Sequence, residues 1–574
     1  MILKALYDYY NRCGNLPESG MEEKEIGFLI VISKNGDFLR FEDCRIDKKH
    51  AKTYLVKKHV GRSSAAAANY LYDNSAYVLG VSDKCDEKAL LYFDTFRQSV
   101  NSILDVFPEN EDLQALAAFY RQDREIIAAT IALDPLWEDI KKNLSKKYST
   151  FSFRIEGDTK IMAEKKEILQ LEDIDCDKEQ KSICLVTGDQ GIPVETTTAT
   201  MIPGSQATAK LVAFQVNSGY DSYGKEKCGN APISTEAEFA YTTALNAMLQ
   251  SGSRNKFGVG NRTFVFWASS LSEAAVQAET SLFDLLGYTE ERPDDPNARI
   301  EQVRKVFTSI YSGTLKTSLN DRFYILGLAP NSARIAVVYW SESSLKDFAA
   351  KILQHFQDME IVDTRKDRKP YMGIKDMLSA VTLGGKQSEA TPNLPEAIVQ
   401  SIFQGTPYPY SLFSSCIRRI RAESSDNGAN RIARIAILKA YLNRIKDNHQ
   451  KIDIMLDKNN TNPGYLCGRL FAVLDRIQEV ANGNTSIRER YMNAASATPS
   501  SVFATILNLS SHHLEKLSNE GQKISYEKLK QEIIDKIPAD GFPTHLDLQD
   551  QGRFFIGYYH QRQDFFTKKD VNNS

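Results

Sequence analysis

The chain has 574 residues, of which 42% are hydrophobic and 25% charged, and its formal net charge is −3. A chain of this length is expected to split into about two to four domains. The near-neutral charge excludes a protein coated in cations, so any nucleic-acid surface must be a local patch. No apolar run approaches the ~18 residues of a spanning helix, and no membrane segment is expected.

The eight cysteines are scattered, without a Cys-x-x-Cys pair. This spacing favours neither a zinc site nor a disulfide framework. Lys4, Asp8 and Arg12 interrupt the short apolar stretch that a signal peptide would need. We therefore expect a soluble cytoplasmic protein with reduced thiols, no metal and no cofactor.

The first part of the chain mixes strand patterns with helical ones. Asn35-Gly36 separates two apolar runs, at 27–33 and 38–46, and this arrangement is the strongest short-range signal of a β-hairpin. Pro330-Asn331-Ser332 separates a second such pair. Further strand patterns lie at 149–157, 181–188, 209–216 and 261–268. Helical periods lie at 88–107, 235–249 and 342–356.

Strand patterns stop near residue 390, and helices account for the rest. Helix starts are expected at Asn462-Pro463, Thr498-Pro499, Ser525 and Thr544. The last helix carries a wide aromatic face, expected to be mainly core, with a docking surface for another subunit as the alternative. Its residues are Phe554, Phe555, Tyr558, Tyr559, Phe565 and Phe566.

These patterns predict an α+β protein rather than a doubly wound parallel sheet. A mixed, mainly antiparallel, β-rich N-terminal body is expected over 1–390. A basic helical connector is expected over 391–454, and an all-α C-terminal bundle over 455–574.

A basic run occupies residues 45–62 and contains a single acid, Asp47. Its basic residues are Arg45, Lys48, Lys49, Lys52, Lys57, Lys58 and Arg62. Amides and phenols follow, at Asn69, Tyr70, Tyr72, Asn74 and Tyr77. Cations for phosphates, followed by amides and rings that address bases, are typical of a nucleic-acid reading element. Phosphate contacts are predicted for Lys52, Lys57, Lys58 and Arg62. The alternative is a solvated charged surface leading into a helix.

Asn69 and Asn74 are expected to contact bases. In a minor groove the readable pattern is nearly restricted to A·T against G·C, and an amide offers both donor and acceptor there. The rings of Tyr72 and Tyr77 are expected to wedge the first base step. The alternative is that Asn74 caps or turns the backbone and that Tyr77 belongs to the core.

A polar loop holds Ser222, Tyr223, Gly224, Lys225 and Lys227. Glycine lets the backbone approach a ligand, and lysines neutralise phosphates, so contacts to a nucleic-acid strand are predicted for Ser222, Tyr223, Lys225 and Lys227. A plain surface turn is the alternative.

A second basic patch lies between Arg418 and Lys446. Sequence-independent contacts to single-stranded nucleic acid are predicted for Arg418, Arg419, Arg431 and Arg434. Arg431 and Arg434 share one helix face by their i, i+3 spacing. An ordinary solvated helix is the alternative.

Motifs of catalysis are missing. Gly384-Gly385-Lys386 lacks the other residues of a phosphate-binding loop, and Gly258-Val259-Gly260 precedes a strand instead of a helix. No His-Glu-x-x-His or Gly-x-Ser-x-Gly occurs, and His512-His513 is interpreted as a helix-start pair. We expect no catalysis; the alternative is a stand-alone nuclease or other hydrolase.

The chain resembles the large subunit of the type I-C Cascade, an RNA-guided surveillance complex of CRISPR immunity. Four segments carry the resemblance: Met1–Arg12, Arg62–Gly80, Gly204–Tyr241 and Asn462–Phe566. The resemblance implies a non-catalytic subunit that recognises the protospacer-adjacent motif in duplex DNA. It also implies help in opening the duplex, forming the R-loop and recruiting a helicase–nuclease. In such a complex the strand at the polar loop is expected to be the guide RNA or the target strand, and the strand at the second basic patch to be the displaced one. The implied partners are CRISPR RNA, target double-stranded DNA, the Cascade backbone and guide-end-capping subunits, a small subunit and the helicase–nuclease.

Met455 stands at the head of the predicted bundle. Some members of the resembled family make their small subunit by starting translation inside the large-subunit message. A start at Met455 would give a product of 120 residues that holds the whole bundle. The alternative is an ordinary methionine.

Overall fold

The computed structural model describes residues 2–567 apart from 19, 48–49, 61–65, 83–85, 147–148, 170, 172–180, 215–222, 287–295, 366–371, 387–388, 424–427, 446–449 and 484–485. The chain forms two compact units. The small unit consists of Cys13–Glu195 and Val216–Thr243, and the large unit of Met1–Arg12, Thr196–Gln215 and Ala244–Ser574. Because each unit is assembled from separate segments, no single linker divides the sequence. The division expected at residues 390 and 454, into a recognition body, a connector and a bundle, stays a prediction.

The small unit is built around a four-stranded sheet in the order β3-β2-β6-β5. These strands span Phe38–Asp43, Phe28–Ile32, Thr150–Ile155 and Tyr72–Asn74. β2 and β3 are antiparallel, so the hairpin predicted at Asn35-Gly36 is confirmed. β2 pairs with β6 in parallel, and β5 pairs with β6 antiparallel. A separate two-stranded ribbon joins β1 (Met21–Glu25) to β4 (Thr53–Lys57).

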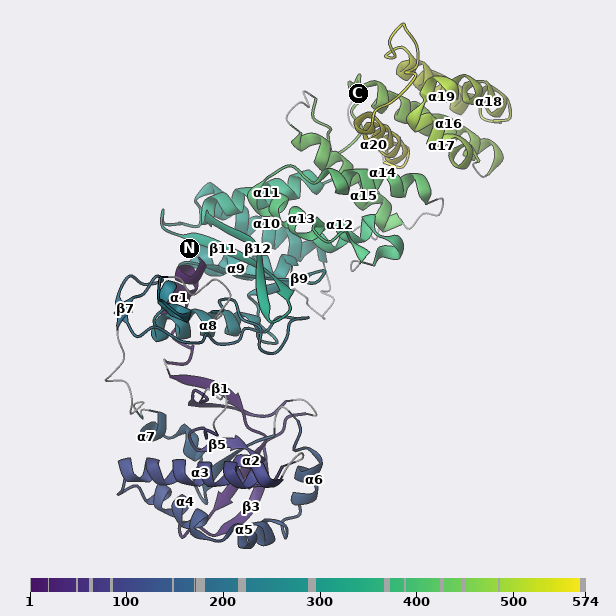
Figure 1. The fold of residues 1–574 in the computed structure, drawn as a ribbon. Helices are drawn as coiled ribbons and strands as arrows, with labels where there is room; N and C mark the ends of the chain where they lie inside the picture. The colour runs from purple at the N-terminus through teal and green to yellow at the C-terminus, as the bar shows by residue number, and fades with distance from the viewer. Residues whose placement is uncertain are drawn as a thin grey trace. The chain divides into compact units, whose positions relative to one another are not determined.

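Helices complete the small unit (Figure 1). They are α2 (Ser75–Val78), α3 (Asp86–Val106), α4 (Glu111–Arg121), α5 (Arg124–Ile131), α6 (Trp137–Lys142) and α7 (Lys166–Leu169), with 3₁₀ turns at Met162–Glu164 and Lys227–Asn230. Phe96 of α3 and Phe119 of α4 contact the Phe153 ring of β6 at centroid distances of 6.3 and 5.9 Å. Such ring contacts between helix and sheet form the core of this unit. The sequence predicted one strand at 181–188. The structure has only the two-residue strand β7 (Ser182–Ile183) there, and it pairs with β8 (Gln190–Gly191) in a short hairpin.

The large unit carries an antiparallel sheet in the order β12-β11-β10-β9. Its strands span Arg334–Ser344, Arg322–Asn331, Arg262–Ala268 and Lys256–Val259, so the second predicted hairpin is confirmed. Helix α1 (Ile2–Arg12) belongs to this unit, because Tyr9 meets the Trp267 ring edge-on at 6.3 Å. The strand expected at 209–216 is wrong for its described residues, which make a single bridge at Lys210.

Helices dominate the remainder of the large unit, and no strand follows β12 in the described residues. They begin with α9 (Glu273–Leu286), α10 (Pro296–Ser312), α11 (Leu345–Met359), α12 (Ile374–Val381), α13 (Leu394–Gln404), α14 (Tyr410–Ala422) and α15 (Gly428–Arg444). The C-terminal helices are α16 (Pro463–Asn482), α17 (Ile487–Ala497), α18 (Phe503–Glu515), α19 (Glu520–Ile534) and α20 (Leu548–Asp564). Helix α8 (Thr235–Leu249) starts in the small unit and ends in the large one. The predicted α+β class is confirmed.

The helix start expected at Asn462-Pro463 is confirmed, and the one expected at Thr498-Pro499 agrees with the structure only in part. Asn462 caps α16 through its side chain, which accepts a hydrogen bond from the Tyr465 amide at 3.1 Å. Thr498 precedes only the 3₁₀ turn Pro499–Ser501, and α18 begins at Phe503. His512-His513 lies in the last turn of α18, so the interpretation as a helix-start pair was wrong.

The other two expected starts were wrong. Ser525 lies inside α19, whose cap is Asn519. Asp547, and not Thr544, caps α20. Several capping residues stand within a few positions of each other here, and packing selects among them.

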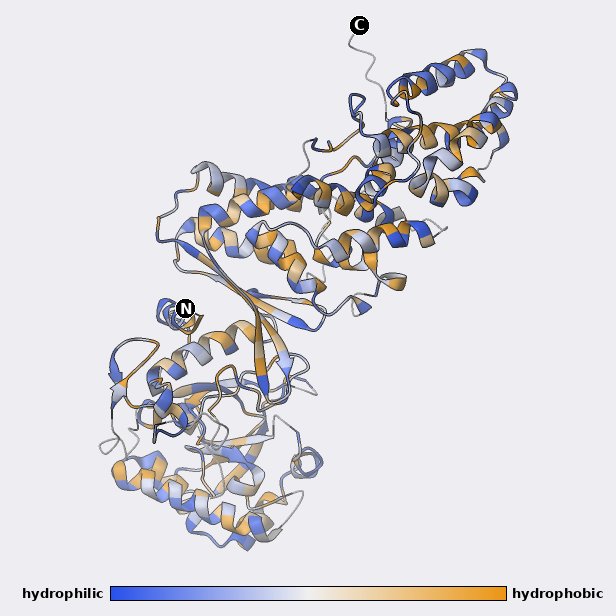
Figure 2. Cartoon of the chain, turned by 45° about the horizontal axis from the view of Figure 1, so that its top comes forward, coloured by the Kyte–Doolittle hydropathy of each residue, from blue (hydrophilic) through white to orange (hydrophobic). Residues whose placement is uncertain are grey.

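The C-terminal helices surround α16, and they carry hydrophobic and hydrophilic residues on different sides (Figure 2). On α20 the aromatic side chains Phe554, Phe555, Tyr558 and Tyr559 are buried, whereas Phe566, just beyond the end of the helix, is half exposed. The expectation of a mainly buried aromatic face is confirmed. Within the described residues, no helix combines the length and apolar character needed to cross a bilayer.

Glycines let α16 and α20 approach closely. A methyl group added at Gly468 would collide with the backbone carbonyl of Phe554, and one at Gly557 with that of Tyr465. Overpacking of this kind costs about 1–3 kcal/mol. We expect Gly468→Ala to lower the urea midpoint of the full chain. Gly521→Ala in α19 is the matched control, because its nearest neighbour is 3.4 Å away. Equal midpoints for the two variants would contradict the close contact.

Candidate nucleic-acid interface

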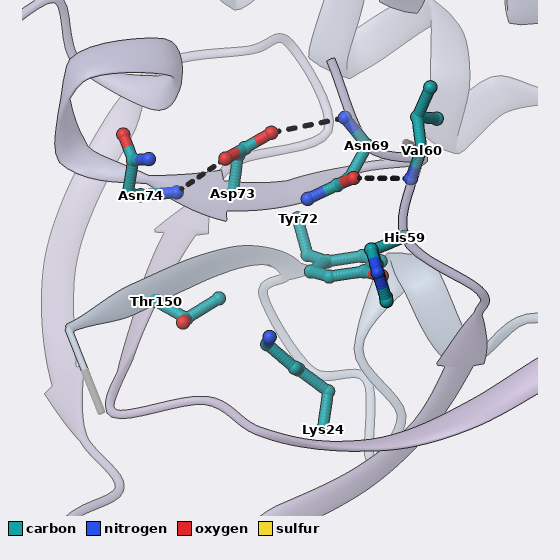
Figure 3. Close-up of a pocket in the computed structure, with 8 residues that line it drawn as sticks. All are labelled: Lys24, His59, Val60, Asn69, Tyr72, Asp73, Asn74 and Thr150. Carbon is teal, nitrogen blue, oxygen red and sulfur yellow. Dashed lines mark hydrogen bonds between the residues drawn. The ribbon is translucent and has the colours of Figure 1, made fainter. Parts of the chain in front are cut away.

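A pocket of about 270 Å³ lies in the small unit, where β5 runs into α2. Its walls are formed by Lys24, His59, Val60, Asn69, Tyr72, Asp73, Asn74 and Thr150 (Figure 3). Three of these, Asn69, Tyr72 and Asn74, were predicted to form the base-reading element. The structure therefore places them around one pocket, together with cationic and polar side chains from distant strands.

Asn69 is tied to the chain on both sides. Its side-chain Oδ1 accepts a hydrogen bond from the Val60 backbone N–H at 2.9 Å. The backbone N–H of Asn69 donates to Asp73 Oδ2 at 3.0 Å. Only 8% of the residue is exposed. Leu71, two positions on, has a φ of 59°, which side chains with a Cβ rarely adopt. The Ser152 hydroxyl donates to the Leu71 carbonyl at 2.9 Å and helps to hold this turn.

Asn74 is the N-cap of α2. Its Oδ1 accepts hydrogen bonds from the Ala76 amide at 3.0 Å and the Tyr77 amide at 3.4 Å. The capping role, which the sequence left open as the alternative, is thus present. The residue is nevertheless exposed and lines the pocket.

The two tyrosines expected to wedge a base step lie in the core. Tyr72 is fully buried, and its hydroxyl oxygen lies 2.9 Å from both Glu22 Oε1 and the Lys57 carbonyl oxygen, which share its one proton as acceptors. Tyr77 is 4% exposed and stacks on Tyr92 with ring centroids 4.6 Å apart. Neither ring extends into solvent, so neither is placed to wedge a base step.

Glu22 and His59 pair beside the pocket. The His59 ring Nδ1 lies 2.8 Å from Glu22 Oε2, and the His59 amide donates to Oε1 at 3.2 Å. Burial raises the pKa of the Glu22 carboxyl, but the hydrogen bond and charge of His59, with Lys24 and Tyr72, outweigh it and leave the pKa below its ordinary value. The carboxylate is therefore ionised at neutral pH, and Lys24 supplies a cation on the same face.

The predicted phosphate ligands separate into two kinds. Lys52 is exposed, with its ammonium 4.9 Å from the centre of the Tyr54 ring. Lys58 is partly exposed and lies 3.6 Å from Glu238. Lys57 is 6% exposed, and its ammonium donates to the Leu171 carbonyl and lies over the Tyr70 ring. Lys57 thus has a structural role, and Arg62 lies outside the described residues.

The second predicted site is an exposed turn in the small unit. Tyr223 is 99% exposed, and Lys225 also faces solvent. Lys227 makes an ion pair with Glu195 at 2.8 Å, which raises the pKa of the lysine. Ser222 lies outside the described residues. The turn therefore offers one exposed ring and one exposed lysine.

The predicted arginine patch lies in the large unit and is mostly engaged in internal contacts. Arg434 is 4% exposed, pairs with Glu423 at 2.7 Å and donates to the Ala380 carbonyl. Arg431 lies over the Tyr558 ring at 5.5 Å, and Arg419 is 3.7 Å from Glu423. Arg418 remains exposed, with a hydrogen bond to Ser415.

Sequence reasoning missed Lys24, His59, Asp73 and Thr150 as pocket residues. Asp73 accepts hydrogen bonds from the amides of both Asn69 and Asn74, and so fixes their spacing. Its place between the two asparagines was a usable signal. Lys24 and Thr150 carried none, because strand pairing across long sequence distances brings them here. No group of three or more His, Cys, Asp or Glu side chains suited to a metal occurs in the described parts of the chain.

A protein-family model described as CRISPR-associated protein (Cas_Csd1) matches residues 6–566. The match covers the pocket, the exposed turn and the C-terminal helices. No curated protein matches the chain.

Lys52 and Lys57 provide a test of the phosphate assignment. We expect Lys52→Ala to weaken binding of the chain to duplex DNA equally for all sequences and to reduce the salt slope by roughly one, with unchanged stability. Lys57→Ala is expected to lower the free energy of unfolding by about 1–3 kcal/mol, since the Leu171 carbonyl loses its partner. Salt titrations and urea unfolding measure the two effects. A reduced salt slope with intact stability for Lys57→Ala would reverse the assignment.

Proposed function

The chain belongs to the Cas_Csd1 family of CRISPR-associated proteins and is a component of Cascade, and from this premise we propose that it recognises the motif flanking the DNA target. In this proposal it is the large subunit of a type I-C complex. Base pairing with the CRISPR RNA supplies long-range specificity, and the protein reads a short stretch of duplex; the same division of labour in single-protein effectors is an analogy.

One observation carries the proposal: Asn69 and Asn74 line the same pocket within a chain segment that the family match covers. Amides are suited to base edges in the minor groove, where hydrogen-bonding groups of both bases are accessible. Lys52 lies directly before strand β4 and Lys58 directly after it, and these cations would contact phosphates of the duplex.

Further surfaces would serve the rest of the R-loop. The exposed Tyr223 and Lys225 are suited to stacking and phosphate contact with the guide RNA or the target strand. Arg418 would hold the displaced strand. The partners in this proposal are the backbone and guide-end-capping subunits, a small subunit and a helicase–nuclease that the assembled complex recruits.

The subunit is proposed to be non-catalytic. The rival is a nuclease or other hydrolase acting alone, and the two differ in a direct assay. We expect the purified chain to leave DNA and RNA intact with Mg²⁺ or Mn²⁺ present, and to bind them weakly with a steep salt dependence. Metal-dependent cleavage that copurifies with the chain, and that disappears in a chain variant, would support the rival.

Flank-dependent binding tests the proposal. We expect Asn69→Ala and Asn74→Ala to reduce binding of the assembled complex to targets with the correct flank about tenfold or more, while guide RNA is retained. The matched control is Asn110→Ala, because Asn110 caps α4 in the same unit through hydrogen bonds to two backbone amides, and it is not a pocket residue. Gel-shift titrations with correct and scrambled flanks give the comparison. Equal binding by wild type and both variants would overturn the site.

We also propose that translation starts a second time at Met455. The product would hold α16–α20, and Met455 itself is 63% exposed in an irregular segment before α16. In the full chain α20 also contacts residues that precede Met455: Arg431 of α15 lies over Tyr558, and the Tyr559 hydroxyl donates to the carbonyl of Val362, which follows α11, at 2.6 Å. The short product would expose these faces and bind through them.

Expression of the single reading frame tests the internal start. We expect a second product of 120 residues whose N-terminus is Met455. Met455→Leu should abolish it and preserve the full chain, because the exposed side chain makes little contribution to packing. Mass spectrometry of the purified products decides the point. Absence of the short product, or a different N-terminus, would contradict the proposal.

A further inference from the structure

The hydrogen-bond donors and acceptors of the two pocket asparagines are not equally available. A backbone amide can only donate, so the atom that accepts from it must be the amide oxygen. At Asn69 this fixes Oδ1 toward Val60. At Asn74 it fixes Oδ1 toward the first turn of α2. In both residues the NH₂ group therefore points away from these backbone partners.

These orientations are costly to reverse. Turning the Asn69 amide over would place NH₂ against the Val60 N–H and leave a donor without a partner, a loss of the kind that costs most when the group is buried. Turning the Asn74 amide over would remove the cap of α2. Neither Nδ2 has a hydrogen-bond partner among the described residues. Figure 3 shows the Asn69 oxygen directed at Val60 and its nitrogen on the opposite side.

The turn between the asparagines adds to this rigidity. Asp73 accepts from the backbone amides of Asn69 and Asn74, at 3.0 and 2.9 Å, and is itself 3% exposed. Leu71 holds its left-handed conformation with 1% exposure. Strained backbone that is over-determined by its surroundings is typical of positions that are pre-organised for a ligand. The two NH₂ groups are thus presented at a fixed spacing.

We infer that the pocket reads the minor groove through donors alone, so that it accepts base pairs showing only acceptors there and rejects any pair carrying a 2-amino group. This inference rests on the proposed function, and it replaces the expectation that each amide supplies both donor and acceptor. Purine N3 and pyrimidine O2 accept hydrogen bonds from NH₂, whereas the guanine amino group is a second donor. Two opposed donors lose their bonds to water without forming a new one, so specificity here arises from rejection.

Base analogues separate the minor-groove amino group from the rest of the pair. Inosine has the major-groove edge of guanine without the amino group, and 2,6-diaminopurine has the edge of adenine with it. At each flank position the assembled complex is titrated with A·T, I·C, G·C and diaminopurine·T. We expect A·T and I·C to bind alike at the contacted positions, and G·C and diaminopurine·T to bind about tenfold more weakly.

The relative affinities for the four base pairs show whether a negative result contradicts this inference alone or flank recognition as a whole. Affinities that group adenine with diaminopurine, and guanine with inosine, would show major-groove reading and overturn the inference while flank recognition stands. Affinities that are equal for all four pairs at every flank position would overturn flank recognition itself.

Two variants assign the amino-group penalty to the asparagines. Asn74→Ser keeps an oxygen that caps α2 but has no amide nitrogen, and Asn69→Asp keeps an oxygen for Val60. Each is expected to bring the diaminopurine penalty at one position from about tenfold to near onefold. A structural defect alone would weaken all four pairs equally. Asn110→Ser is the control and should keep the full penalty. Retention of the penalty in both pocket variants would overturn the inference.

Discussion

The pairing of β6 with two partners is the constraint on which the pocket depends. β6 lies between β2, with which it is parallel, and β5, with which it is antiparallel. Thr150 stands opposite Asn74, and the Ser152 hydroxyl holds the Leu71 carbonyl. Parallel pairing requires a long crossover, here the segment that carries α3 to α6. Shifting the register by one residue would turn every side chain of β5 to the other face and dismantle the pocket.

Buried polar groups give this part of the small unit a single arrangement. The Tyr72 hydroxyl, the Glu22 carboxylate and the His59 ring form one chain of hydrogen bonds at the wall of the pocket. Asp73 forms a second one, through the backbone amides of Asn69 and Asn74. Each such group would be costly to bury without a partner, so the networks disfavour alternative turns between β4 and β5. Rigidity at the pocket thus comes from hydrogen bonds among residues that line it or lie beside it.

Local patterns allowed the fold class and the position of the site to be predicted, but not its composition. Asn35-Gly36 predicted a hairpin because the turn and both strands lie within about twenty residues. Asn69 and Asn74 could be predicted to share a site because they lie within one short stretch of the sequence. Lys24 and Thr150 reach the same pocket through long-range strand pairing, which periodicity does not encode. Lys57 looked like a phosphate ligand within a basic run, and its burial follows from the Leu171 carbonyl and the Tyr70 ring, which only the fold brings together.

The capping role and the reading role of Asn74 were set against each other as alternatives at the level of sequence, and the structure makes them compatible. A cap uses the amide oxygen and leaves the nitrogen, so the backbone determines which half of the side chain faces a ligand. The same logic applies to Asn69 and the Val60 amide. An amide whose acceptor is committed in this way has lost its ambiguity, which is the property that makes asparagine tolerant of many partners. Such residues would reject only base pairs that carry a 2-amino group in the minor groove. Pairing with the guide RNA would supply the remainder of the specificity.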